Sequence, residues 1–584
     1  MFILNGSVRA LNWTYLRRHV KLPNLKSTLF IYSRALCDNS LLLHSRVNSY
    51  EEAWKQPHPL VPKYFNFVGD VIDKWASKEQ DGLKVGKGAF WFVQVDGAEV
   101  SWSFKELSNL TKKAANVLEN DCFLKTGERI IVMLPKVPEW WLINLAAIRV
   151  GLILSPANIQ LTGKDILYRF STFQPSAVFV DHQVASVIDQ IADKCPSLRT
   201  KVLVSKEEKH RDGWLSFQSL LEKAPCSHQC VHSRSDEVFS VFFTSGTTGH
   251  PKMVEHTHAS YGIGHHYTAK VLDLTESDIF WNIADTGWAK TAWSSMFTPW
   301  LAGCCVFVHE MPKFDPCLVL KTLERYPIST FCAPPTAYRL IVQQDLKQYS
   351  FSHLQNCLSG GEPLETHHRF EIFCFFKYQT ALCSMLRCLS ARPGSFGKPV
   401  PGIPLTIIDD EEKETPPGVE GHIVLKVKPR RPIGLFKGYT NNPNKMASVF
   451  KGDYFYTGDR GYKDQDGYFW FVGRSDDIII SSGYRIGPFE VESALLEHFA
   501  VMESAVVSSP DPERGEVVKA FVVLKENYRE TDHDILVQEL QGHVKSHTAP
   551  YKYPRKIEFV EELPKTISGK IRRKELRMKE WQKK

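Results

Sequence analysis

The sequence predicts an α/β protein: a large N-terminal domain of parallel-sheet α/β subdomains plus a small β-rich subdomain, followed by a small mobile α+β C-terminal domain. Three observations support this fold class. The chain has 584 residues, which is more than one hydrophobic core usually organises, so at least two domains are expected. Short apolar runs alternate with helical patterns from residue 50 to about residue 473. After residue 474 a separate unit of roughly a hundred residues begins, which is the size of a domain.

The N-terminal pattern alternates strand and helix. Residues 129–134 (RIIVML) have the composition of a buried strand, and residues 138–150 follow with a helical pattern. Further apolar runs predict strands at residues 176–180, 202–204, 238–243, 305–308 and 329–332. Strands separated by helical segments favour crossover connections and parallel sheets.

The pattern changes near residue 399. Short strands bounded by Gly, Pro and Asp are expected at residues 405–409, 421–427 and 468–472, and they predict the β-rich subdomain. The C-terminal domain is expected to contain helices at 489–497 and 532–547 and strands at 501–507 and 517–524. We therefore predict an N-terminal domain over residues 46–475 and a C-terminal domain over residues 476–584.

The beginning of the chain is basic and free of acidic residues. Residues 1–37 contain no Asp or Glu, and their Lys and Arg side chains are mixed with apolar and hydroxyl residues. Such segments are typical of mitochondrial transit peptides, whereas a secretory signal has a longer uninterrupted apolar block. We predict a transit peptide over residues 1–45 and a location in the mitochondrial matrix. A disordered basic tail is the alternative.

The composition argues against several classes of protein. Hydrophobic residues make up 43% and charged residues 23% of the chain, as in ordinary soluble globular proteins. The net charge of +7 is spread along the sequence, which argues against a nucleic-acid-binding protein. The 13 cysteines have no paired CxxC spacing, so free thiols are expected. The longest apolar stretch, residues 140–156, is interrupted by Asn144 and Arg149 and is too short for a membrane span.

A loop rich in Gly and hydroxyl residues follows the apolar run at 238–243. It reads TSGTTGHPK and consists of Thr244, Ser245, Gly246, Thr247, Thr248, Gly249, His250, Pro251 and Lys252. Glycines let the backbone approach an anion closely with its amides pointing inward, and Lys252 adds a positive charge. The spacing differs from the P-loop pattern GxxxxGK[ST], which weighs against a kinase or GTPase. Taken alone, the loop is also compatible with an ordinary turn.

Two further motifs extend this pattern. Residues 454–492 read YFYTGDRGYKDQDGYFWFVGRSDDIIISSGYRIGPFEVE, and residues 564–572 read PKTISGKIR. In this order, the three motifs resemble those of the adenylate-forming superfamily, which includes acyl-CoA synthetases, luciferases and the adenylation domains of peptide synthetases. The segments EWWLINLAAIRVGLI, ADTGW, SGGEPL and PGSFGKP are similar to the medium-chain acyl-CoA synthetases of mitochondria.

The resemblance implies a site for ATP formed by the loop at 244–252 and by later motifs. Asp459 is expected to accept hydrogen bonds from the ribose diol, and Arg474 is expected to reach the ribose or the phosphates. Lys570 is expected to stabilise charge on the α-phosphate and on the attacking carboxylate, which suits a mobile lysine. Lys570 and Lys252 are the expected catalytic residues. The wall near adenine is expected to include Gly360, Gly361 and Glu362.

The resemblance also implies sites for coenzyme A and for the acyl group. The candidates for binding coenzyme A are Ser482, Gly483, Tyr484, Arg514, Lys545 and Arg555, and each basic residue among them could equally be a surface charge. Trp288 of ADTGW is expected to line the acyl pocket, with an ordinary core position as the alternative. Arg485 is expected to contact the substrate or the nucleotide. Asp476 stands where the family places its hinge.

One motif departs from the family pattern. The family has Tyr-Gly-x-Thr-Glu, whose Tyr packs against adenine, whose Thr meets phosphate and whose Glu helps to bind Mg²⁺. This chain has Tyr378, Gln379, Thr380 and Ala381 in that place. The interval 361–394 is also shorter than the family pattern and rich in Cys and Phe, as a replaced exon or genuine decay would leave it. Mg²⁺ prefers oxygen ligands and Ala381 supplies none, so no metal ligand is assigned.

The implied activity is an enzyme reaction that uses ATP, Mg²⁺ and coenzyme A. A fatty carboxylate attacks the α-phosphate, pyrophosphate leaves, and the thiol of coenzyme A then displaces AMP from the acyl-adenylate. Two alternatives stay open: a catalytically impaired protein that binds nucleotide or acyl-CoA without turnover, and a ligase for aromatic acids such as benzoate. The expected partners are these small molecules, and the expected oligomeric state is a monomer.

Overall fold

The computed structural model describes residues 50–55, 59–84, 86–205, 210–244, 251–359, 378–379, 383–384, 392, 395–481, 484–566 and 570–582. They lie within one unit of the chain, Leu43–Lys584. The predicted transit peptide (residues 1–45), the loop residues 245–250 and most of the segment 360–394 lie outside the described residues. Among the described helices, none has both the length and the apolar character that a membrane crossing requires.

An eight-stranded sheet has the strand order β19-β9-β8-β4-β3-β5-β6-β7. The strands from β8 to β7 are parallel, whereas β9 pairs antiparallel with β8 and β19 pairs antiparallel with β9. The strands predicted at 129–134, 176–180, 202–204 and 238–243 are confirmed. The bounds of the strands are β3 (Arg129–Met133), β4 (Ile153–Pro156), β5 (Ala177–Val180), β6 (Thr200–Leu203), β7 (Leu215–Ser216), β8 (Val238–Thr244), β9 (Lys252–Thr257) and β19 (Gly438–Tyr439).

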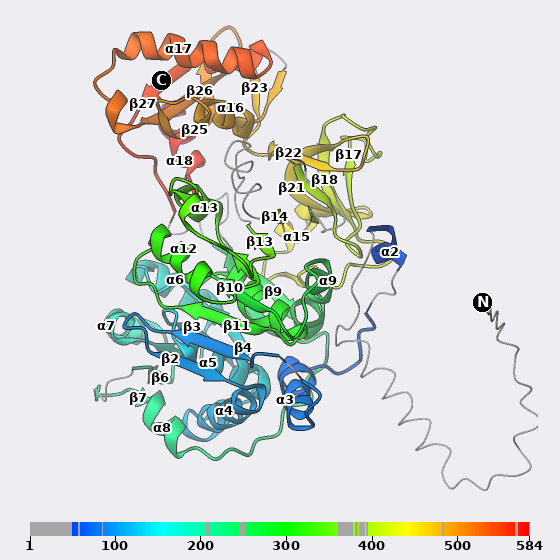
Figure 1. Cartoon of the computed structure of the whole chain (residues 1–584), viewed down its shortest axis with the longest axis vertical. Helices are drawn as coiled ribbons and strands as arrows, with labels where there is room; N and C mark the ends of the chain where they lie inside the picture. The colour runs from blue at the N-terminus through cyan, green and yellow to red at the C-terminus, as the bar shows by residue number, and fades with distance from the viewer. Residues whose placement is uncertain are drawn as a thin grey trace, which may run out of the picture. The chain divides into compact units, whose positions relative to one another are not determined.

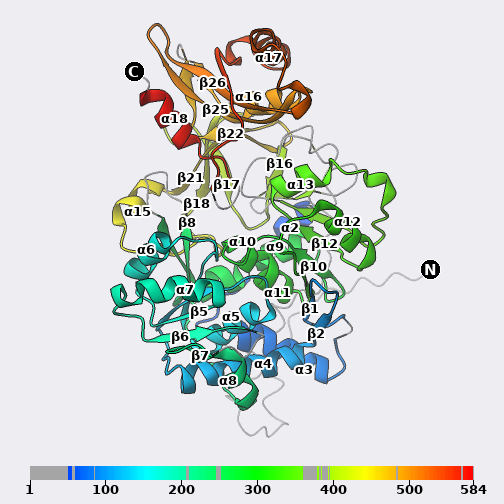
Figure 2. The same cartoon turned by 90° about the vertical axis from the view of Figure 1, so that its left-hand side faces the viewer.

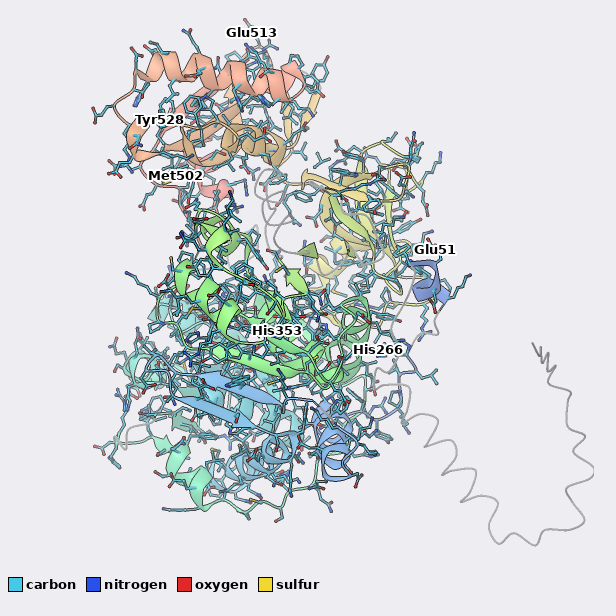
Figure 3. The ribbon with its side chains drawn as sticks, in the orientation of Figure 1. Glu51, His266, His353, Met502, Glu513 and Tyr528 are labelled. Atoms are coloured by element: carbon cyan, nitrogen blue, oxygen red, sulfur yellow. The ribbon has the colours of Figure 1, made fainter. Side chains whose placement is uncertain are left out.

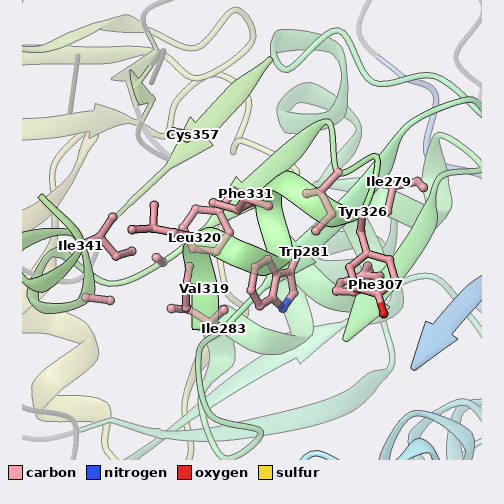
Figure 4. Close-up of a cluster of buried hydrophobic side chains, with 14 of the residues drawn as sticks. Ile279, Trp281, Ile283, Phe307, Val319, Leu320, Tyr326, Phe331, Ile341 and Cys357 are labelled. Carbon is pink, nitrogen blue, oxygen red and sulfur yellow. The ribbon is translucent and has the colours of Figure 1, made fainter. Parts of the chain in front are cut away.

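A seven-stranded sheet has the order β14-β13-β12-β10-β11-β1-β2 and is parallel except for the antiparallel pair of β1 and β2. Its core contains aromatic side chains of the strands packed against α12 (Pro316–Arg325) and α13 (Pro335–Ile341), as Figure 4 shows. The strands predicted at 305–308 and 329–332 are confirmed. The bounds of the strands are β1 (Phe90–Val93), β2 (Glu99–Trp102), β10 (Ile279–Asn282), β11 (Cys305–His309), β12 (Thr330–Cys332), β13 (Asn356–Leu358) and β14 (Tyr378–Gln379).

Helix α5 (Pro138–Val150) has the bounds that the sequence predicts. Proline at its first position suits the start of a helix, and Gly151 ends it with φ of 78°, a conformation that glycine adopts without strain. The other helices of the N-terminal part are α2 (Tyr50–Lys55), α3 (Asp73–Gln80), α4 (Phe104–Asn116), α6 (Gly163–Phe173), α7 (His182–Ile191), α8 (Phe217–Lys223), α9 (His266–Val271), α10 (Ala289–Ala292), α11 (Thr298–Leu301) and α15 (Pro443–Val449) (Figure 1).

The loops at the carboxyl ends of the two sheets are joined by reciprocal hydrogen bonds. Lys136, which follows β3, donates to the carbonyl oxygen of Ile283, which follows β10, over 2.7 Å. In return, the hydroxyl of Thr286 donates to the carbonyl oxygen of Leu134. Ligands of open α/β sheets bind at the carboxyl ends of the strands, so this seam between the sheets is a natural place for a site.

The β-rich subdomain is an antiparallel sheet with the order β15-β16-β22-β21-β18-β17, and β20 pairs with β21. The strands predicted at 405–409, 421–427 and 468–472 are confirmed as β17, β18 and β22. The bounds of the strands are β15 (Cys383–Ser384), β16 (Ser395–Pro399), β17 (Leu405–Ile408), β18 (Gly421–Lys426), β20 (Phe450–Lys451), β21 (Tyr454–Lys463) and β22 (Phe469–Arg474).

The C-terminal part is a sheet with the order β24-β23-β26-β25, on which β27 pairs with β26. Helices α16 (Pro488–Leu496) and α17 (His533–His547) pack on one face and α18 (Arg573–Gln582) packs on the other (Figure 2). Glu513, labelled in Figure 3, lies in the turn between β25 and β26. The predicted helices and strands are confirmed, and the bounds of the strands are β23 (Ile479–Ser481), β24 (Tyr484–Ile486), β25 (Val501–Asp511), β26 (Gly515–Leu524) and β27 (Lys556–Phe559).

Candidate active site

The predicted phosphate-binding loop connects two paired strands. Thr244 ends β8, Lys252 begins β9, and the two residues face each other in the antiparallel register. The hydroxyl of Thr244 donates to the carbonyl oxygen of Lys252 over 3.4 Å. The carbonyl oxygen of Pro251 accepts a hydrogen bond of 3.1 Å from the hydroxyl of Tyr168 on α6. The structure therefore fixes both ends of the loop, whose residues Ser245, Gly246, Thr247, Thr248, Gly249 and His250 lie outside the described residues.

Asp459 and Arg474 form an ion pair across two neighbouring strands. They are partners in the register of β21 and β22, and Nη1 of Arg474 lies 2.8 Å from Oδ1 of Asp459. The same guanidinium donates to the carbonyl oxygen of Thr457 over 3.2 Å. Burial raises the pKa of Asp459, while Arg474 opposes that shift. The sequence predicted both residues for the nucleotide, and the structure brings them together.

Gly458 makes room for this ion pair. Its φ is +82°, and a Cβ at this position would lie 2.8 Å from Nη2 of Arg474. Any other residue here would meet both a strained backbone and the guanidinium. The glycine of the TGD sequence is therefore explained by the geometry of its neighbours.

Positive charge gathers around the ion pair. Burial lowers the pKa of Lys445 on α15, and the charges of Lys252 and Arg474 lower it further, whereas Asp476 raises it. The charges of Lys252 on β9 and of Arg474 on β22 thus both reach Lys445 on α15. Sequence reasoning missed Lys445, because NNPNK belongs to none of the three motifs and only its position in space reveals it.

Asp476 lies just after β22, where contacts from the C-terminal domain reach the chain. Nε of Arg474 lies 3.4 Å from Oδ1 of Asp476. Arg577 of α18 donates to the carbonyl oxygen of Asp476 over 2.6 Å. Burial raises the pKa of the neighbouring Asp477, and Asp476 adds to that shift. The predicted hinge residue is therefore next to the predicted ribose-binding pair.

The backbone of Lys570 is paired with Thr566 in the C-terminal domain. Its amide donates to the hydroxyl of Thr566 over 3.1 Å, and the amide of Thr566 donates to the carbonyl oxygen of Lys570 over 2.7 Å. The side chain is exposed. These hydrogen bonds join Thr566 to Lys570 within the PKTISGKIR segment, while residues 567–569 lie outside the described residues.

Several candidates for coenzyme A binding surround two tyrosines. The ring of Tyr484 stacks on that of Tyr551, with centroids 4.3 Å apart. Nζ of Lys545 lies 4.0 Å from the ring centroid of Tyr553, and Arg555 contacts the same ring at 5.0 Å. The amide of Arg514 donates to Asp511 in the turn after β25. Ser482 and Gly483 lie outside the described residues, as does the side chain of Arg485, whose backbone belongs to β24.

Trp288 lies half-buried at the start of α10, beside the seam of the two sheets. There Asn158 donates to Oδ1 of Asp285 over 3.0 Å. Burial lowers the pKa of Lys136 to about 8, against the opposing charge of Asp285. Burial also raises the pKa of Asp285. Sequence reasoning missed Lys136 and Asp285, although each is a charged residue shortly after a buried strand.

The altered motif is described only in part. Tyr378 and Gln379 form β14, which pairs with β13 at the edge of the seven-stranded sheet. Thr380 and Ala381 lie outside the described residues, as do Gly360, Gly361 and Glu362. Alanine has no side-chain oxygen to offer Mg²⁺. The residues present therefore do not fit the protein ligand of the family pattern.

The architecture matches solved structures closely. The crystal structure of the anthranilate CoA ligase AuaEII in complex with anthranoyl-AMP has 28% sequence identity, covers 90% of this chain and 98% of its own, and has a TM-score of 0.78. An acyl-CoA synthetase from Brucella canis has 29% identity over 92% of this chain and all of its own, with a TM-score of 0.67. The fold and the site thus define the class of adenylate-forming ligases.

Sequence comparison narrows that class. The family model described as AMP-binding enzyme matches residues 80–440, and that of the AMP-binding enzyme C-terminal domain matches residues 490–570. The human mitochondrial acyl-coenzyme A synthetases ACSM3 and ACSM5 are 50% and 46% identical, over 93% and 97% of this chain and over 94% and 99% of their own. ACSM4 from Homo sapiens is 52% identical over 89% of this chain and 91% of its own. The chain belongs to the AMP-binding enzyme family, within its group of mitochondrial medium-chain acyl-CoA synthetases.

Proposed function

We propose that this chain joins medium-chain fatty acids to coenzyme A in the mitochondrial matrix, at the expense of ATP, with AMP and pyrophosphate as products. The observation that carries the proposal is the Asp459–Arg474 pair beside Lys252 and Lys445. A carboxylate that faces a ribose diol and a group of cations that faces phosphates are what a site for ATP requires. The relatives with about half of their residues identical are acyl-coenzyme A synthetases by name.

In the first half-reaction an oxygen of the fatty carboxylate attacks the α-phosphorus of ATP, and the bond from that phosphorus to the bridging oxygen of pyrophosphate breaks. Asp459 accepts hydrogen bonds from the ribose hydroxyls, and these bonds fix the position of the nucleotide. Lys252 and Arg474 offset the charge of the phosphates, and Lys570 offsets the charge that builds between carboxylate and α-phosphate. Catalysis of this kind rests on positioning and on charge neutralisation.

In the second half-reaction the sulfur of coenzyme A attacks the acyl carbon, the bond from that carbon to AMP breaks, and the thiol proton is lost to solvent. We propose that the domains over 46–475 and 476–584 rearrange about Asp476 between the two halves. The stacked Tyr484 and the cations Lys545 and Arg555 on Tyr553 would then meet coenzyme A. Trp288 would line the acyl pocket at the seam of the sheets.

The test is fatty-acid-dependent exchange between ATP and labelled pyrophosphate, with hexanoate and octanoate as acids and MgATP as nucleotide. We expect exchange by the wild-type chain and a loss of at least tenfold in Lys570→Ala. The matched control is Lys579→Ala, which removes an exposed lysine of α18 and should leave exchange unchanged. A folded wild-type chain that binds ATP without any exchange would overturn the proposal and indicate an impaired, nucleotide-binding protein.

The same assay with benzoate separates fatty from aromatic substrates. Faster exchange with octanoate than with benzoate is expected if the acyl pocket accepts an extended chain. The reverse order would indicate an aromatic-acid ligase.

A further inference from the structure

Three metal-ligating side chains of the C-terminal domain converge at the ends of two helices. Glu497 follows the last residue of α16, and His543 and His547 lie one turn apart in the last part of α17. Each can supply a ligand atom, and these atoms all lie within 4.8 Å of one another. None of the three belongs to the motifs that carry the proposed ligase reaction.

The helix geometry aligns the two histidines. Residues four apart lie on the same face of a helix, and the rings of His543 and His547 are stacked with centroids 4.0 Å apart. Their helix packs against α16 through Leu536, Leu540 and Val544, which lie in one buried cluster with Leu495. Because this packing fixes the two helices, Glu497 is held opposite the histidine pair rather than brought there by chance in a loop.

The hydrogen bonds of the two rings indicate which nitrogen of each can bind a metal ion. Nδ1 of His547 lies 2.8 Å from the carbonyl oxygen of His543, and a donated hydrogen bond there leaves Nε2 as the lone-pair nitrogen. Nε2 of His543 is buried, and no described residue forms a hydrogen bond with it.

We propose that Glu497, His543 and His547 form a binding site for a divalent transition-metal ion, which in the cell is Zn²⁺. Two imidazoles and one carboxylate are a common zinc ligand set, with water in the fourth position. Zinc-to-ligand bonds of about 2.0–2.2 Å require the ligand atoms to close in slightly. Rotation of the exposed Glu497 and His547 side chains allows that movement.

A second layer of polar groups supports the site. Glu539 lies on the same face of α17, one turn before His543, and its Oε1 is 3.6 Å from Nε2 of His498. The ring of His498 lies 5.2 Å from that of His543. These groups add negative charge and enclosure next to the ligands, as the outer shell of metal sites commonly does. A bound ion would tie the C-terminal end of α16 to that of α17.

The test is calorimetric titration of the full chain with Zn²⁺. The chain is first freed of metal with a chelator, and the buffer contains excess Mg²⁺. We expect one strong binding event that weakens at least tenfold in His547→Gln and in Glu497→Gln. His533→Gln is the matched control, since it replaces an exposed histidine at the other end of α17 and should leave zinc affinity unchanged. Both tested ligands are exposed, so the variants should fold as the wild type does.

Thermal unfolding provides a second measurement. Zn²⁺ should raise the Tm of the wild-type chain and of His533→Gln, but not that of His547→Gln, because an ion that binds only the folded state stabilises it. Co²⁺ in place of Zn²⁺ should give the wild-type chain a visible absorption that is absent in the double variant Glu497→Gln, His547→Gln. Equal zinc binding in wild type and in that double variant, or no binding at all, would overturn the proposal. None of these readouts depends on ligase activity.

Discussion

Arg474 takes part in three contacts that hold the predicted nucleotide site together. Its guanidinium contacts Asp459, the carbonyl oxygen of Thr457 and Asp476. Burial works against its charge, yet the surrounding carboxylates raise the pKa of Arg474 above its usual value. The residue therefore remains a fixed cation beside Asp459, which is the property that a partner for phosphate needs.

We expect Arg474→Gln to weaken ATP binding by a factor of ten or more, because a hydrogen bond to a charged group contributes roughly 1.5–3 kcal/mol. Equilibrium binding of ATP in the absence of fatty acid measures the effect. The control is Arg529→Gln, an exposed arginine of the C-terminal domain that should leave ATP affinity unchanged. Unaltered affinity in Arg474→Gln would remove this residue from the site.

Lys136 leads to a prediction about pH. Burial lowers its pKa from 10.5 to about 8, so between these values the folded chain has released a proton that the unfolded chain retains. Raising the pH through this window therefore stabilises the folded state. We expect the free energy of unfolding of the wild type to rise relative to that of Lys136→Met between pH 7.5 and 9.5, by roughly 1 kcal/mol per pH unit at most. Urea unfolding at several pH values measures it, and a constant difference would contradict the assignment.

At this scale the sequence predicted residues to which a motif assigns a role and missed those whose role depends on distant neighbours. Asp459, Arg474 and Lys252 were predicted, and the structure places the first two 2.8 Å apart. Lys445 lies near Lys252 and Arg474, whereas Lys136 and Asp285 lie together at the seam of the two sheets. The spacing of residues in the sequence carries no information about these neighbours. Their contribution is visible only in burial and charge contacts across elements that are distant in sequence.

Among the elements, α18 is held by a buried ion pair. Glu492 of α16 is 3% exposed, and its carboxylate contacts the guanidinium of Arg573 at 2.5 and 2.9 Å. The amide of Val506 also donates to it over 2.7 Å. The ion pair thus joins the first residue of α18 to α16, which packs on the opposite face of the sheet.

Removal of one partner should be costly. We expect Arg573→Met to lower the free energy of unfolding by about 3 kcal/mol, because it leaves a buried carboxylate without its cation. Addition of Glu492→Gln should restore part of the loss, since the amide keeps a bond to Val506 and carries no charge. Urea denaturation measures both. Arg572→Met, which removes an exposed pair with Glu575, should change stability by less than roughly 1 kcal/mol; a similar loss in both single variants would contradict the prediction.

Elements with a strong local pattern were predicted well. The helix expected at 138–150 is α5, whose bounds agree because proline begins it and Gly151 ends it. The antiparallel strands β9 and β2 were not predicted. β9 begins with Lys252 and contains Glu255 and His256, and its buried positions do not alternate, so its sequence has no clear strand pattern.

For the molecule as a whole, the predicted order of domains agrees with the architecture, while the rotation about Asp476 stays a proposal. A rotation of this kind needs a change of backbone dihedral angles at a few residues between domains. Proline fixes φ near −65° and so prevents most such changes. The sequence could place the hinge only through resemblance, since rotation leaves no pattern in composition or spacing.

We expect Asp476→Pro to lower overall acyl-CoA formation at least tenfold while pyrophosphate exchange falls less than threefold. Overall acyl-CoA formation needs both domain arrangements, whereas pyrophosphate exchange needs only one. Asp476→Ala keeps backbone freedom and serves as the control, with both rates close to wild type. Steady-state thioester formation and pyrophosphate exchange on the same preparations measure the two rates. An equal fall in both would argue against a hinge at this residue.

The seam between the two α/β sheets has a consequence for inheritance. Lys136 and Thr286 each donate a hydrogen bond to the loop that carries the other. The backbone of Asn158 leaves no room for a Cβ at Gly287. Each of the two loops therefore fits only the partner loop with which it makes these contacts. Recombinants with a related synthetase should tolerate crossovers before Leu134 or after Gly287 better than crossovers between them, because only the former transmit both loops from one parent.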